Sequence, residues 1–175
     1  HPRVLPYLEE QYRLSGDTAS RQVSVLRSML NQKTATAYQT VKKYLLKEPP
    51  LPSKNYSLNT IFYRLKKDSI ELTASLFPEI LELAYLPEYR SELYELLALM
   101  VDSGTVKAQT YSAFKNHLVM EMRTNLRRIV TAEKNNYANQ EIINEIKSQS
   151  VILLPFYEEK EVKELFGKAL STSLN

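Results

Sequence analysis

The sequence predicts an all-α protein of about seven to nine helices, mostly antiparallel hairpins stacked into a short right-handed α-solenoid. Apolar residues recur with a period near 3.6, and no window alternates apolar and polar residues as a half-buried strand does. Only three of the 175 residues are glycines, which disfavours a β-rich fold because its tight turns need positive φ. Two stretches also share one register about 51 residues apart, and each has the pattern of a helix pair.

The repeat relates residues 17–47 to residues 68–102. Its matched pairs are Asp17 and Asp68, Leu26 and Phe77, Leu30 and Leu81, Tyr38 and Tyr89, and Leu45-Leu46 with Leu96-Leu97. A recurring helix pair predicts stacked hairpins, because each pair buries its apolar face only against its neighbours. Residues 1–175 are therefore expected to form a single helical-repeat domain.

The first two helices are separated by a clear stop signal. The first is expected over residues 2–14, and Gly16 suits the turn that ends it. Asp17 or Thr18 is expected to cap the second, whose apolar face ends at Leu30.

The third helix can be capped by Thr34 or Thr36. The segment Pro49-Pro50-Leu51-Pro52 ends it, because proline disfavours helical geometry in the residue before it. This segment is either a loop between hairpins or a proline-rich ligand for an aromatic groove. A short helix is expected over residues 57–67.

Proline and glycine also divide the middle of the chain. Asp68 is expected to cap a helix in which Pro78 produces a kink or break. Pro87 suits the first position of the next helix, which Gly104 ends. A long helix is expected over residues 106–130.

The last third begins with a break at the asparagine-rich residues 135–139. A shorter helix around residues 142–146 follows, and the apolar run at 151–154 is expected to form a short extended segment or a buried turn. The final helix is expected from about Glu158. Six leucines from these helices are expected to be nearly fully buried: Leu26, Leu30, Leu81, Leu97, Leu118 and Leu126.

Composition limits the function classes. The net charge of +3 is too small to indicate nucleic-acid binding by itself. The absence of cysteine excludes disulfides and cysteine-based metal sites. No apolar run approaches the roughly 18 residues of a membrane span, and no signal peptide is visible. The first residue is His1, so we expect an excised fragment or a processed product, and the compartment stays open.

No catalytic, cofactor-binding or metal-binding arrangement is recognisable, and no cofactor is expected. His1 is terminal, and His117 lies off the apolar stripe of the predicted long helix, where a lone histidine is expected to be an inert surface residue. The adjacent pairs Glu9-Glu10 and Glu158-Glu159 diverge by about 100° on a helix, so neither pair shares a face.

The densest basic cluster consists of Lys115, Arg123, Arg127 and Arg128, which are the candidate contacts for an anion or a nucleic acid. Arg123 and Arg127 are four residues apart and share one helix face, as a row of phosphate contacts requires. The structural alternative is that these two arginines flank the buried stripe and pair with Glu or Asp on a neighbouring helix.

The main aromatic content is twelve tyrosines. Seven of them mostly lie at or beside apolar positions: Tyr7, Tyr12, Tyr38, Tyr44, Tyr89, Tyr94 and Tyr111. Their positions predict core packing with the hydroxyl at the rim. The alternative is an exposed tyrosine ladder on a concave face.

The helix pair at residues 17–47 resembles HEAT-like and armadillo-like hairpins, and residues 68–102 are similar apart from Pro78. The spacing exceeds the usual HEAT period of about 40 to 47 residues. The stretch DTASRQVSVLRSMLNQKTATAYQTVKKYLL is similar to the helical C-terminal region of very large bacterial TraB/GumN-type proteins. That resemblance implies an extracytoplasmic compartment and places the catalytic-type motifs of the family outside this chain, so no functional residue is carried over.

The expected function is a non-catalytic helical scaffold or protein-interaction module, whose partner is another protein or a neighbouring domain of the same chain. The first alternative is a nucleic-acid-binding helical repeat that uses Arg123, Arg127 and Arg128. The second is a helical-repeat enzyme of the base-excision glycosylase type, which the absence of tryptophan and of a convincing acidic pocket residue disfavours.

Overall fold

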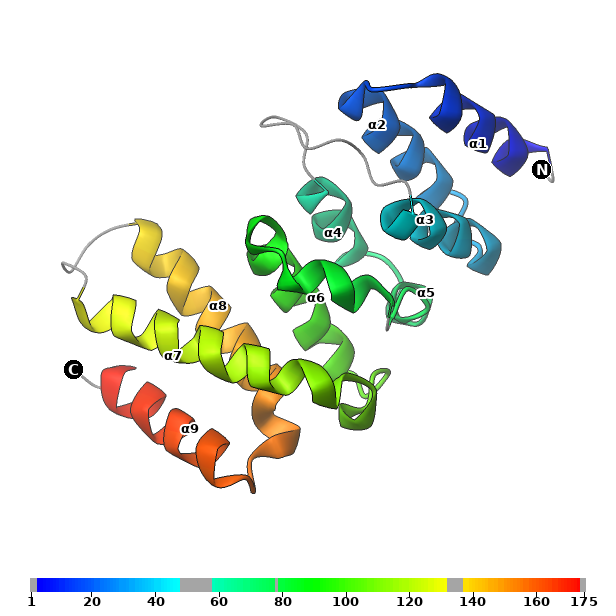
Figure 1. Ribbon diagram of the computed structural model, residues 1–175. Helices are drawn as coiled ribbons and strands as arrows, with labels where there is room; N and C mark the ends of the chain where they lie inside the picture. Colours follow the sequence, from blue (N-terminus) through cyan, green and yellow to red (C-terminus); the bar gives the residue numbers. More distant parts are fainter. Residues whose placement is uncertain (1–2, 48–57, 78, 132–136, 174–175) are drawn as a thin grey trace. The chain divides into compact units, whose positions relative to one another are not determined.

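Figure 1 shows the computed structural model of the chain, which describes residues 3–47, 58–77, 79–131 and 137–173. Within these ranges the chain forms α-helices and short 3-10 helices and no strand, so the predicted all-α class is confirmed. The chain divides into two compact units, His1–Ala84 and Tyr85–Asn175. The single continuous solenoid expected from the repeat stays a prediction.

The first unit is built around its second helix. Its described α-helices are α1 (Val4–Leu14), α2 (Ala19–Leu30), α3 (Ala35–Lys47), α4 (Asn59–Leu65) and α5 (Ile70–Ala74). α2 packs against α1, α3 and α4, which makes it the centre of the unit's core. Gly16 turns the chain between α1 and α2 with φ of +50°, a conformation that favours glycine. Thr34 caps α3, because its Oγ1 accepts a hydrogen bond from the Ala37 N–H at 3.2 Å.

Neither aspartate of the repeat occupies a helix N-cap. Thr18 precedes α2 and Ser69 precedes α5, so the expected capping role of Asp68 is wrong. The Asp68 carboxylate instead accepts a hydrogen bond from Tyr38 Oη at 2.6 Å and lies 3.6 Å from Arg64 Nε. The Asp68 carboxylate therefore has its partners on α3 and α4, although the local sequence predicts that it caps a helix.

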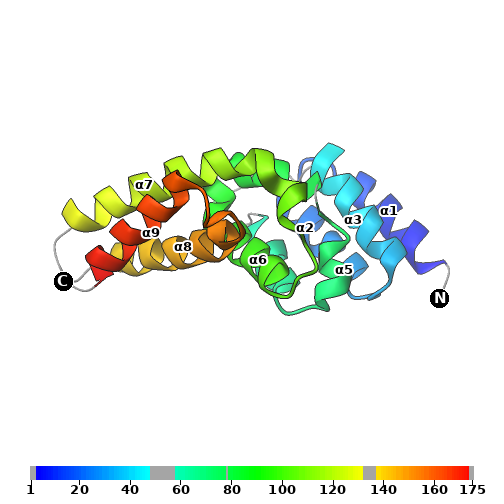
Figure 2. The same ribbon diagram turned by 90° about the horizontal axis from the view of Figure 1, so that it is seen from below.

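The second unit is organised around α8. Its described elements are η1 (Glu79–Tyr85, which begins in the first unit), η2 (Pro87–Tyr89), α6 (Arg90–Asp102), η3 (Ala108–Phe114), α7 (Lys115–Thr131), α8 (Tyr137–Leu153), η4 (Leu154–Phe156) and α9 (Lys160–Ser173). α8 packs against both α6 and α7, and α9 lies along α7 (Figures 1 and 2). Gly104 ends the turn after α6 with φ of +72°, as expected for a helix stop.

Two expectations for this half are wrong. The long helix expected over residues 106–130 is replaced by η3 and α7, and inside η3 Tyr111 leaves helical geometry at φ −128° and ψ 19°. The buried Tyr111 hydroxyl donates to the Ile152 carbonyl at 3.0 Å, a tertiary contact that periodicity does not reveal. The apolar run 151–154 is not extended: its first three residues end α8, and Ile152 and Leu153 are buried.

The second copy of the repeat differs from the first. Its first helix is not continuous, because α5 has five residues and is followed by the separate 3-10 helix η1. Pro78 and the 49–52 segment lie outside the described residues. The boundary between the two units, after Ala84, also falls inside the second copy, residues 68–102.

The predicted core is largely confirmed. Leu26, Leu30, Leu97, Leu118 and Leu126 are buried, whereas Leu81 on η1 is only half-buried. The tyrosines found buried are Tyr12, Tyr38, Tyr44, Tyr89, Tyr94 and Tyr111. Tyr7 is 62% exposed, so core packing is wrong for this one of the seven predicted tyrosines.

Candidate functional site

All four predicted basic residues lie on α7, but they face different surroundings. The Lys115 ammonium contacts the Glu159 carboxylate, and Arg123 Nη2 lies 2.8 Å from Glu161 Oε1. Glu159 directly precedes α9, and Glu161 lies in its first turn. Arg123 therefore pairs with a glutamate on a neighbouring helix, as expected if it has a structural role.

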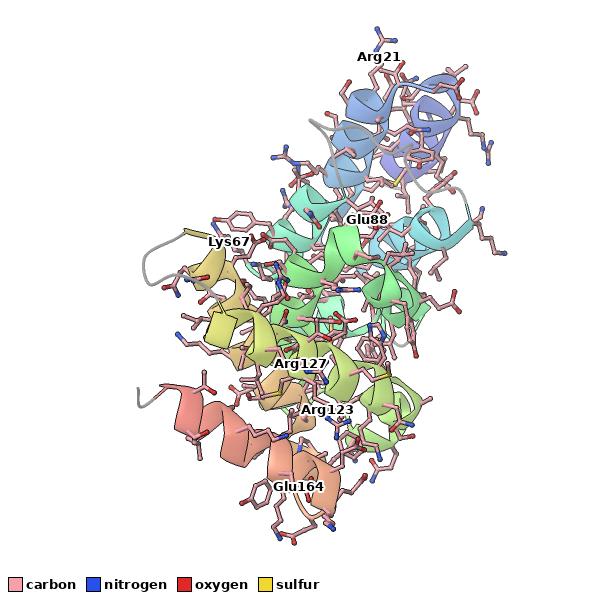
Figure 3. The ribbon with its side chains drawn as sticks, turned by 60° about the vertical axis from the view of Figure 1, so that its left-hand side comes forward. Arg21, Lys67, Glu88, Arg123, Arg127 and Glu164 are labelled. Carbon is pink, nitrogen blue, oxygen red and sulfur yellow. The ribbon has the colours of Figure 1, made fainter. Side chains whose placement is uncertain are left out.

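An open groove of about 620 Å³ runs between α7 and α9. We call it the α7/α9 groove, and its lining residues are Arg123, Leu126 and Arg127 from α7 with Leu165, Lys168, Ser171 and Thr172 from α9. Leu126 and Leu165 form its floor and are buried, whereas Arg127 and Lys168 are exposed. Figure 3 shows Arg123 and Arg127 along α7 and Glu164 on the adjacent α9.

Helical spacing explains how these side chains meet. Arg123 and Arg127 are one turn apart on α7, and Leu165, Lys168 and Thr172 follow the same spacing on α9. The residues that line one side of the groove therefore come from one face of each helix.

Aromatic side chains pack the segment before α9 against the rest of the second unit. Phe156, just before α9, packs edge-on against Tyr111 with ring centroids 5.6 Å apart, and Lys115 lies over the Phe156 ring at 5.5 Å. Tyr157 also packs against Phe166 at 5.7 Å. These contacts lie at the N-terminal half of α9, and the groove lies along its C-terminal half.

The groove is locally basic. Three cationic side chains line it, and none of its described lining residues is acidic. Ser171 Oγ and Thr172 Oγ1 both donate to the Lys168 carbonyl, at 2.9 and 2.8 Å, and the Thr172 oxygen presents lone pairs as an acceptor. The groove can therefore bind an anion through its cations and accept hydrogen bonds from N–H donors of the same ligand.

The structure separates Arg128 from the other two arginines. Arg128 is exposed on α7 but does not line the groove, and Lys115 lies near the start of α9. The cation that completes the groove is Lys168, which the sequence analysis missed. Its spacing of three residues from Leu165 was visible in the sequence, but the pairing of α7 with α9 is a long-range contact.

His117 is not the surface residue expected from the sequence. Its ring stacks on Phe114 with centroids 5.1 Å apart, and its Nε2 lies 3.3 Å from Tyr94 Oη. Tyr85 covers another side of the ring at 4.8 Å. Burial lowers the pKa of His117, Glu121 opposes that shift, and Arg90 adds to it. The sequence signal that was missed is Phe114, three residues before His117 and on the same helix side.

A buried amide pair lies between α7 and α8. Asn125 Nδ2 donates to Glu145 Oε2 at 2.9 Å and lies 3.5 Å from Gln149 Oε1. Gln149 is fully buried, and its Nε2 has no hydrogen-bond partner among the described residues. Burial also raises the pKa of the nearby Tyr94 hydroxyl.

Other kinds of site find little support in the described ranges. A smaller groove of about 340 Å³ lies between α1 and α2, where Arg21 is the one cation among its described lining residues. No cluster of three or more His, Asp or Glu side chains within residues 3–47, 58–77, 79–131 and 137–173 is arranged to hold a metal ion. In the same part of the chain, every helix is too short or too polar to cross a lipid bilayer.

Comparisons with known protein families, with curated proteins and with solved structures found no match to this chain.

Proposed function

We propose that this protein is a non-catalytic protein-interaction module and that the α7/α9 groove binds a segment of its partner. The observation that carries the proposal is the composition of the groove. Its buried leucine floor suits an apolar side chain, and its three cations suit an acidic group on the same segment. Its volume of about 620 Å³ lies in the range of small ligand pockets, roughly 300–1,000 Å³.

The charge of the second unit favours a protein segment over a nucleic acid. Residues 85–175 contain 11 basic and 12 acidic residues, so this unit has a net charge of −1. A typical duplex-binding surface makes about 6–10 phosphate contacts, and the groove offers three cations. Arg128, the third arginine that the nucleic-acid alternative uses, also lies outside the groove.

The glycosylase alternative has less support. An enzyme that acts on a flipped base stacks it between aromatic or apolar side chains. The described residues that line the groove include no aromatic ring and no carboxylate.

Selection of a phage-displayed peptide library on the full chain tests the proposal. We expect enriched peptides that combine an acidic residue with an apolar one. Their affinity, measured by fluorescence anisotropy at 150 mM salt, should fall at least tenfold in the variant Lys168→Glu.

Arg128→Glu is the matched control, because it makes the same charge change on an exposed cation outside the groove. We expect it to change peptide affinity less than twofold, with circular dichroism confirming that both variants are folded. Equal losses in the two variants would show that general electrostatic attraction, and not the groove, governs the affinity. Peptide binding that Lys168→Glu leaves intact would refute the groove as the site.

A further inference from the structure

We infer that the segment bound in the α7/α9 groove carries a phosphorylated side chain, and that Glu161 competes with this phosphate for Arg123. The inference rests on the proposed function and specifies the chemistry of the partner. It follows from three features of the groove: the number of its cations, the ion pair at its edge and the acceptor at its end.

The cations suit a dianion. Arg123 and Arg127 lie on one face of α7 with Cβ atoms about 5–6 Å apart, and Lys168 lies across the groove on α9. A phosphorylated side chain carries a charge of about −1.5 to −2 at pH 7 and has three acceptor oxygens, whereas a carboxylate has one charge and two oxygens. Three cationic donors therefore match a phosphate better than a single carboxylate, and clusters of arginines are a known means of recognising phosphorylated motifs.

Lys168 is the groove cation that is available to an anionic ligand. Within the described part of the chain, its ammonium makes no ion pair, although Lys160 and Lys163 on the same helix pair with Glu164 and Glu158. The groove therefore holds an uncompensated positive charge in a unit whose net charge is negative.

Glu161 is an internal carboxylate at the edge of the groove. It lies 2.8 Å from Arg123, and the two side chains are 49% and 39% exposed. An exposed pair of this kind contributes little to stability, so a more highly charged anion can replace it. A phosphate that binds Arg123 must therefore break only the weak ion pair with Glu161, and the strength of that pair limits the affinity gained.

The acceptor favours a phosphorylated peptide over free phosphate. The Thr172 hydroxyl already donates to the Lys168 carbonyl, so it can only accept from a ligand in its present geometry. A peptide supplies backbone N–H groups, and the floor of Leu126 and Leu165 contacts a neighbouring apolar side chain. Free phosphate uses neither feature.

Three synthetic peptides test the inference on the full chain. They share the sequence of a selected binder and carry serine, glutamate or phosphoserine at the acidic position. By fluorescence anisotropy at 150 mM salt and pH 7.5, we expect the phosphoserine peptide to bind at least tenfold more tightly than the glutamate peptide. Lys168→Gln should remove most of this preference, and Lys147→Gln, which removes an exposed cation on α8, should leave it unchanged.

The role of Glu161 has its own pair of variants. Glu161→Gln releases Arg123 and should tighten phosphopeptide binding about three- to fivefold. Glu164→Gln makes the same charge change one turn along α9, on a carboxylate that faces Lys160, and should change affinity less than twofold. Equal effects of the two variants would overturn the competing role of Glu161.

The remaining outcomes separate this inference from the proposed function. If glutamate and phosphoserine peptides bind equally, the partner is simply acidic and the inference fails while the interaction module stands. If inorganic phosphate displaces the peptide at the same concentration as unlabelled phosphopeptide does, or a labelled single-stranded oligonucleotide binds more tightly than the phosphopeptide, the inference is overturned. If no peptide binds at all, the proposed function itself fails.

Discussion

The two compact units carry their charge in different ways. Residues 1–84 contain 12 basic and 8 acidic residues, a net charge of +4, whereas residues 85–175 have a net charge of −1. The groove with three cations nevertheless lies in the second unit. A local cluster of cations therefore depends less on net charge than on whether two helices direct cations to the same space.

In the first unit, several cations instead have partners close to where they lie. Lys66 and Lys67 lie over the Tyr63 ring at 5.2 and 4.3 Å, and Lys42 donates to the Ser75 carbonyl at 3.2 Å. Arg64 lies beside Asp68. Its positive charge is spread over local contacts, so we expect it to favour general attraction of anions and not a specific site.

Particular buried polar groups of the two units are satisfied in different ways. In the first, the Tyr38 hydroxyl donates to a nearly buried carboxylate, and Thr73 Oγ1 donates to the Leu65 carbonyl at 3.2 Å. In the second, Tyr94 has a histidine as its partner, and Gln149 Nε2 has none among the described residues. Substitutions of matching chemistry in the two units should therefore have different effects.

The largest expected effect comes from truncating the aromatic core of each unit. Phe62 and Phe114 are fully buried, so Phe62→Ala and Phe114→Ala should each cost about 3–5 kcal/mol of unfolding free energy. Hydrogen exchange should show lost protection mainly in residues 1–84 for the first variant and in residues 85–175 for the second. Equal loss throughout the chain in either variant would show that the two units unfold as one.

Removing one buried tyrosine hydroxyl from each unit should lower the free energy of unfolding by different amounts. Tyr38→Phe breaks a hydrogen bond of 2.6 Å to a carboxylate and should cost about 1.5–3 kcal/mol. Tyr94→Phe breaks a bond of 3.3 Å to an imidazole whose pKa burial lowers, and should cost about 0.5–1.5 kcal/mol. Urea denaturation of both variants measures the difference, and a larger loss for Tyr94→Phe would contradict the contrast.

The fold class could be predicted because it depends on local pattern. The apolar stripes of α1, α2, α3 and α9 are visible in the sequence, and so are the stops at Gly16 and Gly104. Five of the six predicted core leucines are buried for the same reason. Each of these features follows from residues within one or two helical turns.

The errors concern residues whose conformation is set by distant partners. Asp68 matches a cap by its position, but its carboxylate bonds to Tyr38, 30 residues earlier. Tyr111 interrupts the predicted long helix, and its hydroxyl bonds to Ile152, 41 residues later. Lys168 joins the candidate site only because α9 packs along α7, which no local pattern specifies.

Two buried polar side chains, one in each unit, should respond to substitution with opposite sign. Thr73→Val removes a satisfied buried hydroxyl of the first unit and should destabilise the chain by about 1 kcal/mol. Gln149→Met removes the Nε2 that has no partner among the described residues, together with a long 3.5 Å contact of Gln149 Oε1. Asn125 keeps its shorter bond to Glu145, so the substitution should stabilise the chain by about 1 kcal/mol. Urea midpoints at unchanged slope measure both effects. Destabilisation by Gln149→Met would show that this amide is better satisfied than its geometry suggests.

The smallest effect should be a pH dependence that belongs to the second unit. Burial places the pKa of His117 below its ordinary value of 6.5, so the unfolded chain binds a proton more readily than the folded one. The stability that neutral His117 contributes is therefore complete above about pH 6.5 and declines as the pH falls below that value towards the lowered pKa of the folded state. Arg90 and Glu121 face the ring with opposite charges, and Tyr94 bonds to it, so no single neighbour should abolish the effect.

Urea midpoints measured between pH 7.5 and pH 5.5 should fall for the natural chain and fall less for His117→Gln, which stays uncharged throughout. Hydrogen exchange at pH 5.5, corrected for the intrinsic exchange rate, should place the extra opening in residues 85–175. His1 is the other histidine of the chain, and His1→Gln is the matched control that should leave the slope unchanged. A parallel decline in His117→Gln and in the natural chain would assign the pH dependence to carboxylates and remove this difference between the two units.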